Sequence, residues 1–143
     1  MAVFKSDVEL YDCIGEFISS VKDNPTIGPK IRQAGIIIRF VYSDPAAQIT
    51  IDAKNPAPEG QFYTVYYGGT SVTPDLVMTM SADTAHSFWL GKVNLMAALT
   101  RGQIVAKGPV ATALKLLPAI QPTYAMYPEF LKAHGREELI KLG

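Results

Sequence analysis

Hydrophobic residues recur every three or four positions near the start of the chain, which predicts an amphipathic helix. Ser6 and Glu9 have the spacing of a capping box, in which a hydroxyl and a carboxylate accept from free N–H groups at a helix start. Asn24-Pro25 breaks this helix, and a short second helix is expected over residues 26–34, ending at Gly35. The apolar face of the first helix comprises Leu10, Tyr11, Ile14, Phe17, Ile18 and Val21.

The pattern becomes strand-like between residues 36 and 81. Residues 36–42 are β-branched and aromatic, a composition typical of strands. Further strands are predicted over 47–53, 61–67 and 75–81, where apolar and polar positions alternate between breaker-rich segments. Alternation leaves one face of a sheet in solvent, so this region predicts an antiparallel meander with one wet side.

Helical spacing returns after residue 81, and a late strand is predicted over 103–107. The tail, residues 121–143, is aromatic and helical in parts, with Pro122 and Pro128 as interruptions. Strands that come first and helices that follow indicate an α+β fold, and the length suits one domain over residues 1–143. The expected boundaries are N-caps at Ser81 and Asn94, stops at Gly91 and Gly102, a helix start at Pro109 and a helix end at Pro118.

Residues 75–117 carry four features in order. A strand ending in Thr-Met-Ser-Ala-Asp runs directly into a helix, and a Gly-Lys-Val-Asn-Leu-Met-Ala-Ala segment follows. A Gly-Gln-Ile-Val-Ala-Lys-Gly strand comes next, and a helix containing Leu-Lys-Leu-Leu closes the segment. In order and spacing, this segment resembles the sterol carrier protein type 2 family.

The resemblance implies a five-stranded, mostly antiparallel sheet with helices packed on one side. It also implies an apolar tunnel between sheet and helices that takes sterols, fatty acids, acyl-CoA or phospholipids. The chain departs from the family in two places, Pro109 and the tail. Pro109 stands where the family usually has an acidic residue, residues 121–143 have no match, and Lys141-Leu142-Gly143 is not a peroxisomal address of the Ser-Lys-Leu type.

Charge and hydropathy narrow the class of partner. The 143 residues include 13 basic and 13 acidic side chains, so the net charge is zero. This balance argues against binding nucleic acid, although it leaves open a homodimer and transient contact with a membrane. Charged residues make up 18% and the mean hydropathy is +0.14. The chain therefore has either a generous core or apolar surface reserved for another use.

The sequence offers little for metals, cofactors or export. Cys13 is the one cysteine, so neither an intramolecular disulfide nor a thiolate metal cluster is expected. No apolar run approaches the ~18–20 residues that span a bilayer, and the start lacks the pattern of a signal peptide. We therefore expect a cytoplasmic protein with no cofactor and no metal.

A lipid ligand needs apolar side chains beyond those that fill the core. The alternative for each candidate is an ordinary core position, although methionine adapts well to varied ligand shapes. The tail aromatics have three interpretations: a lid over the cavity, a dimer face, or a docked terminal helix. The predicted ligand-binding residues are Leu76, Met78, Phe88, Trp89, Leu95, Met96, Leu99, Ile104 and Leu114, with Tyr124, Tyr127 and Phe130 from the tail.

No set of residues suggests catalysis. His86 follows a helix N-cap and is expected to face solvent, without an Asp or Cys partner at a suitable spacing. Ser81 is interpreted as a cap because it lacks a Gly-x-Ser-x-Gly elbow, and Cys13 as a small, semi-buried apolar residue. Arg39 either points to the wet face of the sheet or anchors a carboxylate or phosphate.

The sequence thus favours a non-enzymatic lipid carrier that holds a fatty acid, acyl-CoA, sterol or phospholipid. The alternative is an interaction or accessory domain that dimerises or docks to a lipid-modifying enzyme. Recovery of a bound lipid from the purified protein would distinguish the two.

Overall fold

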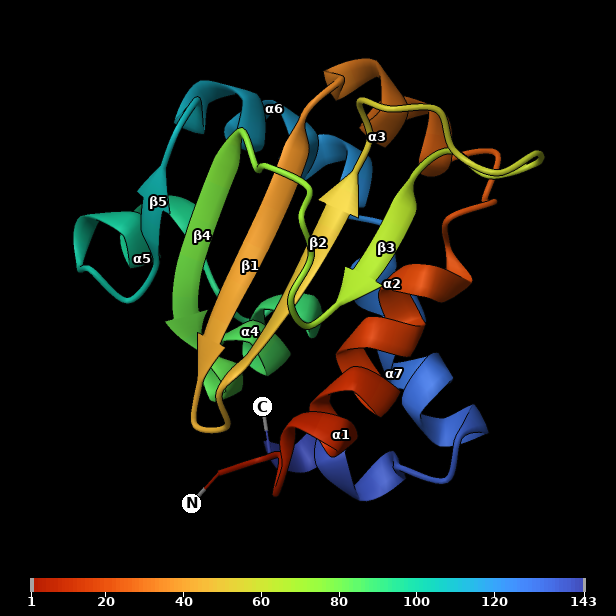
Figure 1. Cartoon of the computed structure of the whole chain (residues 1–143). Helices are drawn as coiled ribbons and strands as arrows, with labels where there is room; N and C mark the ends of the chain where they lie inside the picture. Colours follow the sequence, from red (N-terminus) through yellow and green to blue (C-terminus); the bar gives the residue numbers. More distant parts are fainter. Residues whose placement is uncertain (1, 143) are drawn as a thin grey trace.

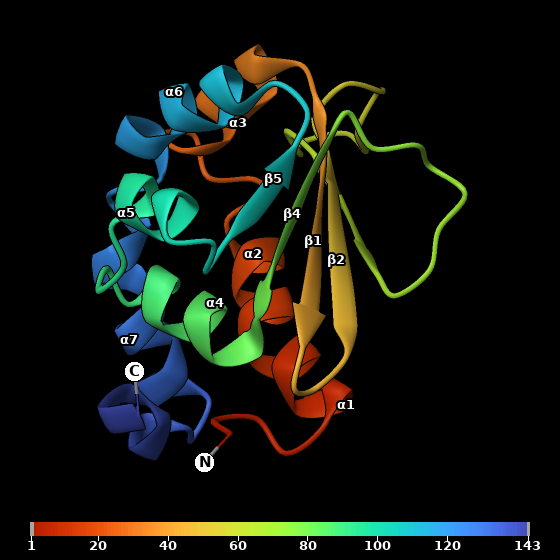
Figure 2. The same cartoon turned by 90° about the vertical axis from the view of Figure 1, so that its left-hand side faces the viewer.

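The segments in which apolar and polar residues alternate form strands of a five-stranded sheet, in the order β3-β2-β1-β4-β5. The computed structural model of the chain describes residues 2–142. Helices cover one face of the sheet and loops lie against the other (Figures 1 and 2). This is the predicted α+β fold class. The strands are β1 (Ile37–Ser43), β2 (Ala47–Asp52), β3 (Thr64–Tyr67), β4 (Leu76–Ser81) and β5 (Val105–Lys107).

The predicted meander is correct for three strands and wrong for the fourth. β1 pairs with β2 and β2 with β3, both antiparallel, but β4 lies on the other side of β1 and pairs with it in parallel. The β3–β4 connection is tied to the outer face by Arg39. Its guanidinium donates to the carbonyl of Val72 at 2.6 Å and to the hydroxyl of Thr50 at 3.0 Å. Arg39 thus secures a loop on the face opposite the helices.

The first predicted helix forms with its cap. It runs through α1 (Asp7–Leu10), a π-helical turn η1 (Tyr11–Gly15) and α2 (Glu16–Ser20). The Ser6 hydroxyl accepts from the Glu9 N–H, and the Glu9 carboxylate accepts from the Lys5 N–H. The second helix, α3 (Gly28–Ala34), ends at Gly35, whose φ of 63° is the left-handed conformation that glycine adopts most easily.

Two later helices, α4 and α5, also begin where their predicted caps place them. Ser81 accepts from the Thr84 N–H at 3.1 Å, and Asn94 accepts from the Ala97 N–H at 3.0 Å. The helices after β4 are α4 (Ala82–Trp89), α5 (Leu95–Thr100), α6 (Val110–Ile120), α7 (Thr123–Ala133) and η2 (Glu137–Leu142), a 3₁₀ helix.

The predicted helix end at Pro118 and the predicted interruption at Pro128 are both wrong. Pro118 lies inside α6 and Pro128 inside α7, whereas Pro122 is the cap between the two helices. An internal proline costs about 3 kcal/mol because it removes a hydrogen bond and crowds the preceding turn. Buried side chains on each helix oppose that cost, Ala119 beside Pro118 and Tyr127 beside Pro128. Tertiary packing therefore overrides the local signal.

The C-terminal segment is a docked terminal helix, one of the three interpretations of the tail. Tyr127 and Leu131 are fully buried, and Leu139 anchors the final turn. Arg136 pairs with Glu9 at 2.8 Å, which joins the end of the chain to the first helix. The tail thus belongs to the packed core of the domain.

Candidate functional site

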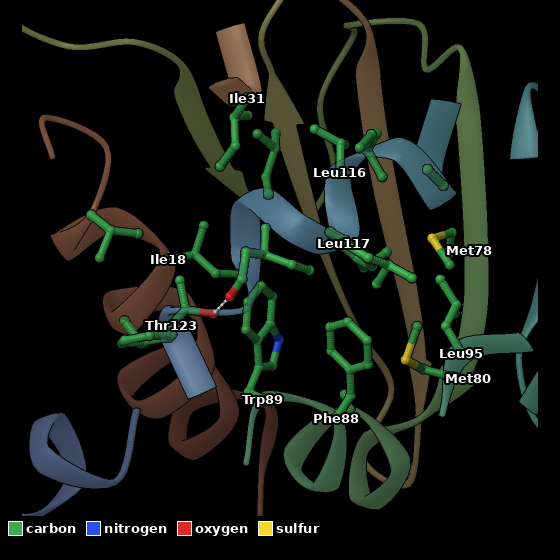
Figure 3. Close-up of a pocket in the computed structure, with 18 of the residues that line it drawn as sticks. Ile18, Ile31, Met78, Met80, Phe88, Trp89, Leu95, Leu116, Leu117 and Thr123 are labelled. Carbon is green, nitrogen blue, oxygen red and sulfur yellow. Dashed lines mark hydrogen bonds between the residues drawn. The ribbon is translucent and has the colours of Figure 1, made fainter. Parts of the chain in front are cut away.

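A cavity lies between the inner face of the sheet and the helices. Ile38, Phe40 and Tyr42 reach it from β1, because alternate residues of a strand point to the same face. Figure 3 shows Phe88 and Trp89 rising from α4 towards Leu116 and Leu117 of α6. Segments from all parts of the chain therefore contribute to the cavity wall. The labelled wall residues in Figure 3 are Ile18, Ile31, Met78, Met80, Phe88, Trp89, Leu95, Leu116, Leu117 and Thr123.

The lining of this cavity is apolar and carries no charged side chain. Three of its residues bear hydroxyls. Tyr63 donates to the carbonyl of Ile18 at 2.7 Å, and Thr123 donates to the carbonyl of Ile120. The Tyr42 hydroxyl has no hydrogen-bond partner among residues 2–142. Burial raises the pKa of Tyr42 and Tyr63 well above the usual range, so both stay neutral and the cavity suits uncharged apolar groups.

The cavity has a volume of about 80 Å³. A single water needs about 10–15 Å³ by this kind of measure, and an engineered apolar cavity of about 150 Å³ admits benzene. In this conformation the cavity therefore has room for a few carbon atoms, and a longer tail requires a wall to move.

The sequence and the fold of the chain can both be compared with those of known proteins. Residues 16–121 match the sequence profile of the SCP-2 sterol transfer family. The chain belongs to the SCP-2 sterol transfer family. No curated protein sequence matches the chain. Its fold is similar to three solved structures described below.

The solved structures share the fold at low sequence identity. Sterol carrier protein 2 from Yarrowia lipolytica, in its apo form, has 21% identity and a TM-score of 0.62 over 78% of this chain and 89% of its own. The sterol carrier protein domain 2 of Helicoverpa armigera has 23% identity and a TM-score of 0.61 over 83% of this chain and 89% of its own. Palmitated SCP2L2 from Aedes aegypti has 18% identity and a TM-score of 0.55 over 76% and 94%.

Some of the residues predicted to bind a ligand lie at the cavity of this SCP-2 family member. Five of the twelve lie at the cavity: Met78, Phe88, Trp89, Leu95 and Ile104. Their contact with a ligand stays a prediction.

The remaining candidates from the body of the domain lie elsewhere. Leu76 is fully buried in the core, while Leu99 and Leu114 are half-buried against it. Met96 is wrong as a lining residue, since it is 56% exposed. In α5 the inward positions are Leu95 and Ala98, three residues apart, and Met96 points to the outside.

The tail aromatics pack behind the cavity wall. Tyr124 meets the Phe88 ring edge to face at 5.9 Å, and Phe130 meets Phe17 at 5.6 Å. Tyr127 contacts the same Phe17 ring at 5.0 Å. The tail therefore holds wall side chains in place, and Thr123 is its residue at the cavity itself.

Several wall residues were missed. The inner face of β1 could have been found from alternation within residues 36–42. The α3 and α6 positions, represented by Ile31 and Leu116, have the helical spacing of ordinary core residues. Which side of a core stays unfilled depends on packing across the molecule, so no local pattern marked them.

The solvent-facing prediction for His86 is wrong. Its side chain is fully buried, Nε2 lies 2.7 Å from the carbonyl of Leu139, and Nδ1 lies 2.8 Å from the Tyr127 hydroxyl. A carbonyl only accepts, so Nε2 carries the proton and Nδ1 accepts from Tyr127. Burial lowers the pKa of His86. The neutral ring joins α4 to the tail and lies outside the cavity lining.

The other two candidate reactive groups, Cys13 and Ser81, lie where they support the fold. Cys13 is buried, and burial raises the pKa of its thiol to about 11, which suppresses the reactive thiolate. Ser81 is occupied as a helix cap. Within residues 2–142 no helix is long and apolar enough to cross a bilayer.

Proposed function

We propose that the protein is a non-catalytic carrier that binds a lipid by its hydrocarbon part in this cavity. The observation that supports the proposal most is a cavity between sheet and helices whose walls are apolar and uncharged. Such a site gains binding energy from removing hydrocarbon from water, without directional contacts. Membership of the SCP-2 sterol transfer family agrees with this use.

The energetics favour a hydrocarbon ligand. Each methylene moved out of water contributes roughly 0.8 kcal/mol, so a tail of about ten methylenes contributes roughly 8 kcal/mol before the costs of association. Fatty acids, acyl-CoA, sterols and phospholipids all carry enough apolar surface. A carrier of this kind acts in the cytoplasm, where a free lipid tail would otherwise be exposed to water.

The first test is direct. The full chain is purified from cells and extracted with organic solvent, and the extract is analysed by mass spectrometry. A lipid present at about one molecule per protein supports the carrier. A protein that is free of lipid, ignores apolar probes and elutes at twice its mass contradicts the carrier and supports a dimeric interaction domain.

A built-in reporter provides the second test. Trp89 is the only tryptophan and lies in the cavity wall. Bromooctane, whose bromine quenches nearby indole fluorescence, should quench Trp89 in a saturable manner, while unbrominated octane should displace it. Quenching that rises linearly without saturation would mean that the probe reaches Trp89 only by collision, which contradicts the proposal.

The interaction domain has less support. The large exposed hydrophobic residues of the described chain are distributed over five elements: Val8 on α1, Tyr67 on β3, Met96 on α5, Val105 on β5 and Leu142 on η2. Stable interfaces need a contiguous apolar patch. The high proportion of hydrophobic residues in the sequence is therefore better explained by the interior of the domain than by a dimer face.

A further inference from the structure

The basic and acidic side chains of the protein are unevenly distributed along the chain. All 13 acidic side chains lie in residues 7–83 and 129–138, so residues 84–128 contain none. With His86 neutral, this segment carries a charge of +4 and the rest of the chain a charge of −4, although the net charge is zero. The basic side chains of the segment are Lys92, Arg101, Lys107 and Lys115.

The fold gathers this segment on one side of the molecule. α5 and β5 lie on the side that faces the viewer in Figure 2, and α6 lies directly above α5. Each of these three elements contributes one exposed cation: Arg101 directly follows α5, Lys107 ends β5, and Lys115 lies within α6. We call the exposed side of α5, β5 and α6 the cationic face.

The three cations of this face are available to a partner. None of them forms an ion pair with another residue of the range 2–142. Asp75, at the start of β4, pairs with Lys54 at 2.9 Å. Asp83 lines the same surface groove as Arg101, but its carboxylate accepts from the Val3 N–H at 2.9 Å. The charge of the cationic face is therefore not compensated by a direct ion pair within the described chain.

Apolar side chains accompany these charges. Lys115 is the one charged residue among the eleven of α6, and Met96 on α5 is 56% exposed. The two buried residues of α6 are alanines. A helix that is apolar on all sides is normally enclosed by protein or by hydrocarbon, yet α6 lies at the surface. Its larger apolar side chains are only partly buried, namely Val110, Leu114, Leu116, Leu117 and Ile120.

We propose that the cationic face docks on a membrane surface that contains anionic lipids. The cations attract the head groups, and Met96 and the apolar side chains of α6 enter the interfacial layer. An acidic protein would supply the charge, but a stable protein interface also needs a contiguous apolar patch, whereas a fluid lipid layer adapts to dispersed side chains. Because α6 also forms part of the cavity wall, docking brings that wall beside a source of lipid.

The test measures binding of the full chain to vesicles by flotation, at low and at high salt. One set of vesicles is phosphatidylcholine alone, and the other is an equimolar mixture with phosphatidylserine. Lys107→Glu/Lys115→Glu reverses two charges of the cationic face. Lys5→Glu/Lys141→Glu is the matched control, because it makes the same change in net charge at two exposed lysines beside α1 and on η2. Both elements lie at the end of the molecule opposite α6 (Figures 1 and 2).

The unchanged protein should bind the mixed vesicles at low salt, bind them less at high salt, and leave phosphatidylcholine vesicles unbound. Lys107→Glu/Lys115→Glu should lower the partition coefficient at least about 10-fold, since each cation near an anionic surface contributes about fivefold. Lys5→Glu/Lys141→Glu should retain most of the binding, because charges farther from the membrane than the screening length act weakly on it.

A second pair of variants tests the apolar contribution. Met96→Ser removes an exposed apolar side chain from the cationic face and should weaken binding to the mixed vesicles. Val8→Ser makes a similar change on α1, where Val8 is 62% exposed, and should leave the binding unchanged. Equal effects of the two substitutions would contradict the insertion of Met96.

Three results overturn the inference. They are equal losses in the two lysine double variants, no loss in Lys107→Glu/Lys115→Glu, and no binding of the unchanged protein to the mixed vesicles. A dimer in sedimentation that Lys107→Glu/Lys115→Glu dissociates would also overturn it, by assigning the face to a second copy of the chain. Bromooctane quenching of Trp89 in the same samples tests the proposed function separately, because Lys107 and Lys115 lie outside the cavity lining.

Discussion

Filling the cavity should stabilise the protein and stop it from binding. Ala113 lies on α6, is buried and lines the cavity. Ala113→Leu extends three more carbon atoms into that space. Ala111 lies on the same helix but is exposed, so Ala111→Leu makes the same chemical change away from the cavity. Alanine and leucine are both strong helix formers, so neither substitution changes the helix propensity of α6 much.

The volume of the cavity sets the size of the expected stabilisation. At about 24 cal/mol per Å³, a cavity of about 80 Å³ corresponds to about 2 kcal/mol of lost stability. Burying three more carbons contributes a similar amount, and imperfect packing removes part of it. We expect Ala113→Leu to raise the free energy of unfolding by about 1 kcal/mol, which raises Tm by about 2 to 4 °C in a protein of this size. Ala111→Leu should leave Tm unchanged.

Thermal unfolding and Trp89 quenching by bromooctane measure the two effects on the same samples. Ala113→Leu should reduce the affinity for the probe at least 10-fold, since the probe and the leucine occupy the same space. An Ala113→Leu protein that is folded and still binds bromooctane normally would refute the reasoning, because the ligand would then sit elsewhere. Binding lost equally in Ala111→Leu would refute it as well.

Three further predictions concern titratable groups. Burial lowers the pKa of His86, so the unfolded chain binds more protons than the folded one, and stability should fall as pH drops below about 6.5, by at most about 1.4 kcal/mol per pH unit. Denaturation between pH 8 and 5 should show a smaller loss of stability in His86→Gln than in the unchanged protein, and an equal loss in both would contradict this. Cys13, whose pKa burial raises to about 11, should react with thiol reagents at pH 8 only at the rate of unfolding, and fast labelling of the native protein would contradict this. The Lys54 ammonium lowers the pKa of Asp75. The contribution of this ion pair to the free energy of unfolding is present above about pH 4 and is lost in more acidic solution, so Asp75→Asn should narrow the difference in stability between pH 6 and pH 3.

Local signals predicted most of the secondary structure. The caps at Ser81 and Asn94 and the stop at Gly35 involve hydrogen bonds and φ values within a few residues, so their residue types suffice. The position of β4 did not follow from such signals. Alternation in residues 75–81 is the same whether β4 pairs in parallel with β1 or continues a meander beyond β3, and the choice depends on a connection held by Arg39.

The site was predictable only in part, because burial depends on distant segments. His86 has the sequence surroundings of an exposed residue in the first half of a helix, yet a carbonyl 53 residues later covers it. Met96 and Leu95 are adjacent and equally apolar, but the start of α5 at Leu95 turns one inward and the other outward. Tyr42 is a third case, since alternation predicts that its side chain faces the helices but not that its buried hydroxyl lacks a hydrogen-bond partner among residues 2–142.

The small volume of the cavity determines which wall must yield to a longer ligand. β1 and β4 are held by the hydrogen bonds of the sheet, and α2 is held by the bond from Tyr63 to Ile18. Among residues 2–142, α6 is joined to its surroundings by apolar contacts and by the bond from Thr123 at the start of the next helix. When a lipid tail replaces Leu116 and Leu117 against the sheet, one apolar contact is exchanged for another. The exchange costs little, because no hydrogen bond of the sheet is broken and the displaced leucines are only partly buried.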